Sequence, residues 1–92
     1  MNIRFHLDLD GEPHIFEHNV SEEEVIEDLS NPLEESSGSN NTLVATGRTR
    51  SGRILKVIYA PARHEDGIFV ITAFDLPAKQ VKTLNRRLKR RR

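Results

Sequence analysis

Apolar and polar residues alternate at the start of the chain. From Ile3 to Leu9 every second residue is apolar, and the residues between them are charged or imidazole-bearing. A period of two indicates a strand with one buried face, so we predict that all four apolar side chains of this segment face the core. The pair Asp10–Gly11 then predicts a turn.

Two short helices are predicted next. Pro13 suits a first helical turn, because it lacks an N–H that would be unsatisfied there, and Asn19 can adopt the left-handed conformation that ends a helix near His18. The second helix begins in "VSEEEV", where the Ser21 side chain can cap the following amides and the Glu24 side chain can reach back to the amide of Ser21.

The second helix also has a predicted buried side. Val20 and Val25 occupy the positions of a hydrophobic staple, and Val25, Ile26 and Leu29 are expected to form the buried stripe. The Asn31–Pro32 pair predicts the end of the helix, because proline disfavours helical backbone in the residue before it.

The remaining pattern predicts an antiparallel meander and a final helix. The segment "EESSGSNN" indicates a hairpin or flexible loop, and strands are expected at 42–48, 53–60 and 68–76, with turns at 49–52 and 61–67. After Pro77, apolar residues recur at helical spacing on an otherwise basic segment, which predicts a helix docked on the sheet through Ala78, Val81, Leu84 and Leu88. The fold class is therefore α+β: an N-terminal strand, two short helices, an antiparallel β-meander and a C-terminal basic helix.

Length and composition limit the classes of protein. Ninety-two residues form one domain, and a chain without cysteine has neither disulfides nor thiolate metal sites. No apolar run is long enough for a membrane span, and no signal peptide is evident, so we expect a cytoplasmic protein without membrane contact.

The zero net charge conceals a division along the chain. Residues 1–36 contain one basic and eleven acidic residues (1 − 11 = −10), whereas residues 37–92 contain thirteen basic and three acidic residues (13 − 3 = +10). Whether this makes a dipole in space depends on how the two parts pack.

No strong catalytic, cofactor or metal motif is present, so we expect no cofactor and no metal. His14 and His18 are four residues apart, which on a helix places both imidazoles on one face. Such a pair can act as general acid and base, or as two metal ligands. The alternative is structural: one imidazole packs against the sheet and the other faces solvent.

Basic residues are concentrated in two places. In "GRTRSGRILK", Arg48, Arg50 and Arg53 surround one hairpin and are expected to form a row that binds phosphate; the alternative is a solvated hairpin tip that protects an edge strand. From Lys79 to Arg92 there are eight basic residues and no acidic one, which is typical of a phosphate-binding element. Because aromatic residues are scarce, contact with the nucleic-acid backbone is expected rather than base reading.

Three segments and the basic C-terminus together resemble a known family. "EHNVSEEEVIEDL", "GRTRSGRILKVIY" and "GIFVITAFDL" are similar to segments of the BrnT-type ribonuclease toxins of bacterial toxin–antitoxin pairs, over about residues 12–92. The resemblance implies a RelE-like or barnase-like fold, metal-independent RNA cleavage and a small DNA-binding antitoxin as partner. It departs from the family at Phe74, where those toxins typically have an arginine.

The resemblance and the charge pattern together give a leading hypothesis: a toxin-like RNA-binding domain with candidate ribonuclease activity. His18 would transfer protons, and Arg48 and Arg53 would hold the scissile phosphate. The candidate RNA-binding residues are Arg50, Lys56, Lys79, Lys82, Arg86 and Arg87, with residues 79–92 as a basic tail on the single domain 1–92. The competing hypothesis is a non-enzymatic interaction module whose basic tail binds an acidic partner or the acidic half of its own chain.

Overall fold

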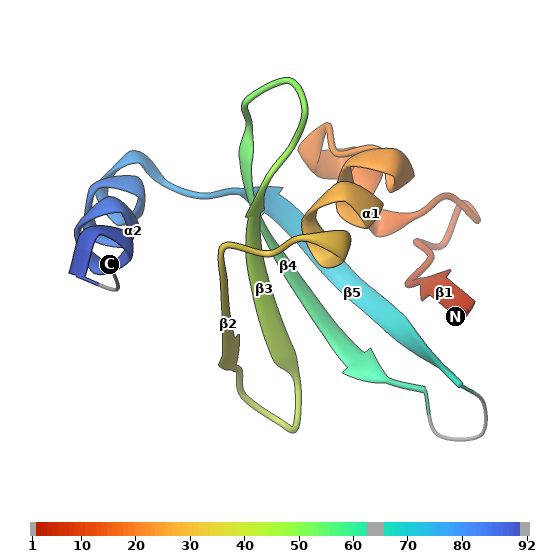
Figure 1. Cartoon of the computed structure of the whole chain (residues 1–92). Coiled ribbons are helices and arrows are strands. Elements are labelled where there is room, and N and C mark those ends of the chain that lie inside the picture. The colour runs from red at the N-terminus through yellow and green to blue at the C-terminus, as the bar shows by residue number, and fades with distance from the viewer. Residues whose placement is uncertain (1, 63–65, 91–92) are drawn as a thin grey trace.

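Five strands form one sheet that carries helices on both faces (Figure 1). The computed structural model describes residues 2–62 and 66–90. Its elements are β1 (Asn2–Phe5), the 3₁₀ helix η1 (His14–His18), α1 (Glu22–Ser30), β2 (Glu34–Ser37), β3 (Leu43–Arg48), β4 (Ile54–Pro61), β5 (Gly67–Asp75) and α2 (Ala78–Arg90).

The strand order is β1-β5-β4-β3-β2. The strands β2, β3, β4 and β5 form an antiparallel meander, whereas β1 pairs parallel to β5 at the opposite edge. The predicted α+β class and its antiparallel meander are therefore confirmed. The sheet is mixed because β1 pairs parallel to β5, whereas the other strands pair antiparallel.

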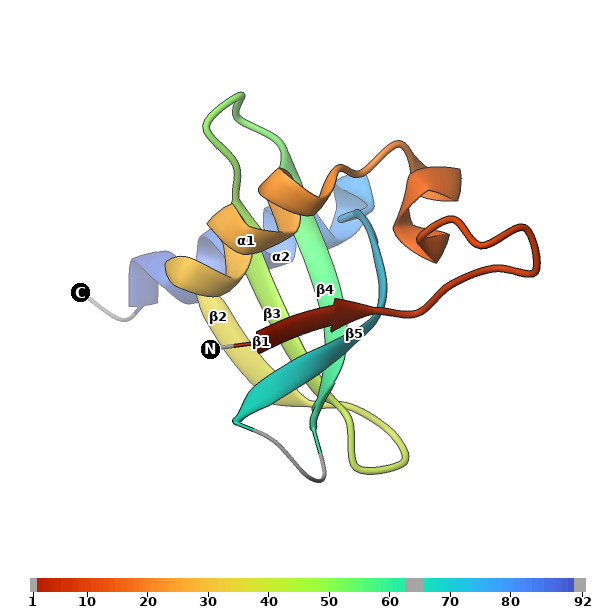
Figure 2. The ribbon, with the colours of Figure 1, turned by 90° about the vertical axis from the view of Figure 1, so that its right-hand side faces the viewer.

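The helices are divided between the two faces of the sheet. Two perpendicular views place α1 and α2 on opposite sides of it (Figure 1, Figure 2). The main core lies on the α1 side and contains the buried residues Ile15, Val20, Val25, Leu55, Val57, Val70 and Ala73. On the other side, Leu84 of α2 is fully buried and Val81 and Leu88 are half-buried, as predicted, whereas Ala78 at the start of the helix is exposed and does not belong to the docking stripe.

The predicted start and end signals of the first two helices are present. Asn19 ends η1 with a positive φ of 56°, in the left-handed region. The Ser21 hydroxyl accepts a hydrogen bond from the Glu24 amide, and the Glu24 carboxylate accepts one from the Ser21 amide, both at 3.1 Å. Val20 and Val25, the staple residues, are both buried.

The first strand is shorter than the alternation predicts. It ends at Phe5, and the predicted burial of Leu7 and Leu9 is wrong: their side chains are 53% and 110% exposed. The reason is that the chain leaves β5 after His6, whose amide donates to the Val70 carbonyl, and then turns back, so that Leu7 forms an isolated bridge with Pro13 instead of a ladder.

The buried stripe of α1 also differs from the prediction. Ile26 is 45% exposed, and Asp28 takes the third buried position between Val25 and Leu29. Residues at i, i+3 and i+4 share one side of a helix, whereas Ile26 is rotated about 100° from Val25. The prediction of Ile26 rested on its apolar side chain, whereas the helical spacing from Val25 points to Asp28.

The segment after α1 is a hairpin with a regular strand. Residues 34–37 of "EESSGSNN" form β2, and the turn that follows contains Asn40 and Asn41 with positive φ values of 55° and 63°. The three predicted strands after it are confirmed within one or two residues at each end. Of the predicted turn at 61–67, residues 63–65 lie outside the described residues.

The charge division along the chain becomes a division in space. The acidic helix α1 and the basic helix α2 have the sheet between them (Figure 2). Within the described part of the chain, α2 forms one ion pair, from Arg87 to Glu34 on β2. The alternative in which the basic segment pairs with the acidic half of its own chain therefore holds at Glu34, whereas the described residues show no such pair from α2 to α1.

Candidate functional site

The segment between β1 and η1 folds back on itself. The His14 amide donates to the His6 carbonyl at 2.9 Å, and the Asp8 amide donates to the Glu12 carbonyl at 2.8 Å. Gly11 completes the turn with a φ of 85°, which a residue with a side chain rarely adopts. These backbone contacts bring Asp8 beside the first residue of η1.

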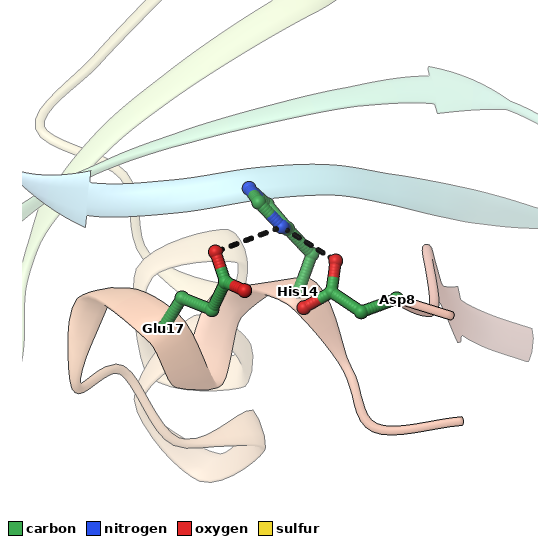
Figure 3. A group of neighbouring side chains, drawn as sticks. All are labelled: Asp8, His14 and Glu17. Carbon is green, nitrogen blue, oxygen red and sulfur yellow. Dashed lines mark hydrogen bonds and ion pairs between the residues drawn. The ribbon is translucent and has the colours of Figure 1, made fainter. Parts of the chain in front are cut away.

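Asp8, His14 and Glu17 meet at this point (Figure 3). The Nδ1 atom of His14 lies 2.8 Å from Asp8 Oδ1 and 3.7 Å from Glu17 Oε2. With its proton on Nδ1, His14 donates a hydrogen bond to Asp8 and presents Nε2 as a free acceptor. A carboxylate that orients an imidazole in this way is a common arrangement for proton transfer.

The imidazole of His14 is also the centre of a row of five aromatic rings. Its ring centroid lies 5.9 Å from that of His6 and 5.4 Å from that of His18. Phe69 contacts His6 at one end of the row, and Phe74 contacts His18 at the other. The predicted pairing of His14 with His18 is therefore present, and both side chains are partly or fully accessible.

Phe74 places one end of this row on the α2 side of the sheet. It is directly paired with Lys56 on β4, and directly paired residues point to the same face. Lys56 in turn lines a depression of about 270 Å³ between α2 and the sheet.

Arg53, predicted to hold phosphate, is bound within the molecule. Its guanidinium donates to both oxygens of Asp75 at 2.9 and 3.0 Å, to Glu24 at 2.9 Å, and to the carbonyl of Asn19 at 2.6 Å. A further contact reaches the His18 carbonyl at 3.4 Å. The hydrogen bond from Arg53 lowers the pKa of Asp75, and Arg53 joins β4 to β5, η1 and α1.

The other two hairpin arginines have different surroundings. Arg50 is 94% exposed, its amide donates to Glu27 Oε1 at 3.2 Å, and its Nε lies 3.6 Å from Glu27 Oε2. Arg48 is exposed at the end of β3 and borders the same shallow depression as Arg50. With Arg53 held by carboxylates elsewhere, the three do not form one row of free cations.

Arg87, predicted to bind RNA, anchors α2 to the sheet. Its Nε and Nη2 atoms donate to the two oxygens of Glu34 at 2.6 and 2.7 Å. This bidentate pair raises the pKa of Arg87, through hydrogen bonding first. Lys56 lies in the same interface between α2 and β2–β4, so neither residue belongs to the outward surface of α2.

The outward surface of α2 is uniformly basic. Positions 79, 82, 86, 89 and 90 fall within about 100° on a helical projection, opposite the stripe that contains buried Leu84. We call these side chains the cationic face; its residues are Lys79, Lys82, Arg86, Lys89 and Arg90. Within residues 2–62 and 66–90, none of these five side chains forms an ion pair, and the tail residues 91–92 lie outside the described residues.

Sequence analysis missed His6, Asp8 and Glu17. No short motif joins Asp8 to His14, because their proximity depends on the backbone turn between them. The proximity of Glu17 to His14 could have been predicted from the sequence, since residues three apart in a 3₁₀ helix lie on the same side.

Asp28 was missed as well, although its spacing after Val25 signals a buried position. Its side chain is fully buried, and neither oxygen has a hydrogen-bond partner within the described part of the chain. Burial raises its pKa to about 7, the Gly47 backbone opposes that shift and the charge of Glu35 adds to it. Because its side chain is fully buried, we treat Asp28 as a determinant of stability.

Comparisons with known proteins give no relative: no family model, no curated protein and no solved structure matches this chain. The resemblance to the BrnT-type toxins therefore stays a prediction. Among the described residues, neither helix is long and apolar enough to cross a membrane.

Proposed function

We propose that this protein binds RNA through the phosphate backbone, along the cationic face of α2. The observation that carries the proposal is that five basic side chains point away from the sheet on one helix, and that none of them forms an ion pair with a carboxylate among the described residues.

The physical argument rests on charge and spacing. Residues three and four apart on a helix have Cβ atoms about 5–6 Å apart, so the cationic face presents a continuous row of donors to a chain of phosphates. The acidic helix α1 lies beyond the sheet, so the field of the molecule attracts an anion to the α2 side and repels it from the other.

RNA, rather than another polyanion, is inferred from the resemblance to the BrnT-type toxins. That resemblance also implies a small DNA-binding antitoxin, which would cover the same surface in a complex. The binding is expected to be tolerant of sequence, because the cationic face contains no aromatic residue and no hydrogen-bond acceptor for reading bases.

The proposal is tested by measuring affinity for a single-stranded RNA of about 20 nucleotides against salt concentration, by fluorescence anisotropy. If all five side chains of the cationic face contact phosphates, the slope of log K against log[salt] is about −3.5, so that affinity falls about 100-fold between 50 and 200 mM salt. An affinity that is absent at 50 mM salt, or independent of salt, would refute the proposal.

A matched pair of variants locates the binding surface. Arg86→Gln removes one charge from the cationic face, and the slope should become less steep by about 0.7. Arg50→Gln removes the same charge beside Glu27, and the slope should stay unchanged. Equal effects of the two variants would mean that net charge, and not α2, determines binding.

The salt titration also distinguishes the competing hypothesis of a non-enzymatic module with an acidic protein partner. Such a module would bind poly-glutamate at least as tightly as RNA at the same salt concentration. The RNA proposal predicts weaker binding to poly-glutamate, because guanidinium groups form stronger bidentate contacts with phosphate in a regular chain.

A second candidate function is metal-independent cleavage of the bound RNA, and the Asp8–His14–His18 arrangement favours it. His14, oriented by Asp8, would accept the proton of the attacking 2′-hydroxyl, and His18 would protonate the departing 5′-oxygen. Phe74 stands where the BrnT-type toxins have an arginine, so another residue would have to supply that positive charge. Arg48 or Lys79 would do so, because Arg53 is already bound to carboxylates.

Cleavage is tested with labelled RNA in the presence of EDTA. His18→Ala and His14→Gln should each lower the rate at least 100-fold, which corresponds to the usual contribution of one general acid or base. Arg48→Ala or Lys79→Ala should lower the rate through loss of the positive charge, and the larger loss identifies which of the two supplies it. Arg50→Gln serves as the control and should retain the rate. RNA that stays intact at high protein concentration would eliminate cleavage and leave the binding proposal standing.

A further inference from the structure

We propose that Asp8, His14 and Glu17 form a binding site for one divalent transition-metal ion of the zinc class. This proposal goes beyond RNA binding and does not depend on it, because none of the three residues belongs to the cationic face of α2. An ion bound at His14 Nδ1 would replace the hydrogen bond from His14 to Asp8 that the cleavage candidate uses, so the cleavage candidate describes the metal-free protein.

The distances between the donor atoms fit such an ion. Asp8 Oδ1, His14 Nδ1 and Glu17 Oε2 all lie within 4.8 Å of one another, and two of the separations are 2.8 and 3.7 Å. Zinc bonds of about 2.0–2.1 Å at tetrahedral angles require ligands about 3.3–3.4 Å apart. The two separations from His14 differ from this value by about half an ångström. The side chains of Asp8 and His14 are 23% and 29% exposed and that of Glu17 is 62% exposed, so Glu17 is the ligand that can adjust most freely.

The choice of donors indicates which class of ion the site prefers. One imidazole nitrogen and two carboxylates are ligands typical of zinc and its neighbours, whereas calcium and magnesium take oxygen ligands only. The two negative charges of the carboxylates balance the charge of a divalent cation. The ion would bind the neutral tautomer of His14 that carries its proton on Nε2.

A single hydrogen on His14 Nδ1 cannot bond to both carboxylates of this cluster. Nδ1 of His14 carries at most one hydrogen, and Asp8 at 2.8 Å is its acceptor. Glu17 Oε2, 3.7 Å away, is too distant for a hydrogen bond to the same atom, yet it points to it (Figure 3). A cation at the position of that proton interacts with both carboxylates at once.

The backbone holds the ligands in place before any ion binds. His14 and Glu17 are three residues apart in η1, and the bridge between Leu7 and Pro13 fixes Asp8 against them. Three protein ligands leave a fourth position for water, as in zinc sites that are open to solvent.

The test is calorimetric titration of the full chain, produced without a histidine tag, with zinc chloride. We expect one ion per chain. Asp8→Asn and Glu17→Gln should each weaken the affinity at least tenfold. Asp10→Asn and Glu12→Gln remove the same charges from the neighbouring turn and should leave the affinity within twofold of the original.

A spectroscopic readout separates inner-sphere binding from a diffuse ion atmosphere. Cobalt chloride replaces zinc, and visible absorption bands of a four- or five-coordinate Co²⁺ should appear in the original protein and in both control variants, and be lost in Asp8→Asn and Glu17→Gln. Circular dichroism establishes that each variant is folded, and Glu17 is exposed enough for its substitution to be tolerated.

Several results would overturn the proposal. These are the absence of zinc binding, equal losses in the cluster variants and the turn variants, or cobalt bands that survive Glu17→Gln but disappear in His6→Gln, which would place the ion elsewhere in the histidine row. None of these results bears on the salt dependence of RNA binding, so the two proposals can fail separately.

Discussion

The buried carboxyl group of Asp28 should make this protein less stable as the pH rises through neutrality. The side chain is fully buried between α1 and β3, and neither oxygen has a hydrogen-bond partner within residues 2–62 and 66–90. Asp28→Asn keeps the shape of the side chain but removes the ionisation, so it isolates the contribution of the charge.

The size of the effect follows from the pKa. Burial, the largest cause, raises the pKa of Asp28 from 3.8 to about 7 in the folded protein. Because the folded pKa is the higher one, its contribution to stability is fully present below about pH 4 and is lost as the pH rises through about 7. A difference of about three pH units corresponds to an upper limit of about 4 kcal/mol, and water penetration into the site would reduce it to about 2 kcal/mol.

The assay is urea unfolding at pH 4.5, 6, 7 and 8, followed by circular dichroism. The quantity of interest is the free energy of unfolding of Asp28→Asn minus that of the original protein, since other titrating groups then cancel. This difference should increase by about 2–4 kcal/mol between the lowest and the highest pH. Asp10→Asn, at an exposed position, is the matched control, and its difference should be independent of pH.

A pH-independent difference for Asp28→Asn would contradict the reasoning, because it would mean that the carboxyl group titrates alike in both states. A difference that decreases with pH would be more damaging. It would show that the folded protein stabilises the charged carboxylate, and so that a hydrogen-bond donor reaches Asp28 in solution.

The remaining predictions concern stability and use the same urea assay. Gly47→Ala should destabilise the fold by about 1–3 kcal/mol, because its Cβ would lie 2.7 Å from Asp28 Oδ1 and 3.0 Å from the backbone of α1; a neutral result would mean that α1 can move away. Arg53→Ala should cost about 1–3 kcal/mol through loss of the contacts to β5, α1 and the end of η1, whereas Arg50→Ala should change stability by less than about 0.5 kcal/mol. Similar values for the two would refute the structural role of Arg53. Leu84→Ala should cost about 2–4 kcal/mol because the side chain is fully buried, and Leu9→Ala, at an exposed position, should be neutral; equal losses would show that α2 does not dock as described.

Local signals in the sequence predicted many of the elements correctly. The capping box at Ser21 and the left-handed cap at Asn19 involve neighbours in the chain, so their chemistry can be recognised without the fold. The alternating and helical periods similarly predicted the meander and the docking of Leu84.

The prediction failed where the partner of a residue is distant in the chain. Leu7 and Leu9 continue an alternating pattern, but the chain turns away from β5 after the His6 amide donates to the Val70 carbonyl. Arg53 and Arg48 look alike in the sequence, and only the folded chain shows that Asp75 and Glu24 surround the first of them.

The candidate sites show the same division. The sequence by itself determined that the chain is acidic in its first part and basic in its last, and that α2 has one apolar and one cationic side. Only the tertiary structure decided that the sheet separates α1 from α2, that Arg87 serves as an anchor, and that Asp8 and Glu17 meet at His14. The physical reason is that periodicity and capping act over a few residues, whereas charge pairing and donor clusters depend on distances in space that the backbone path between them sets.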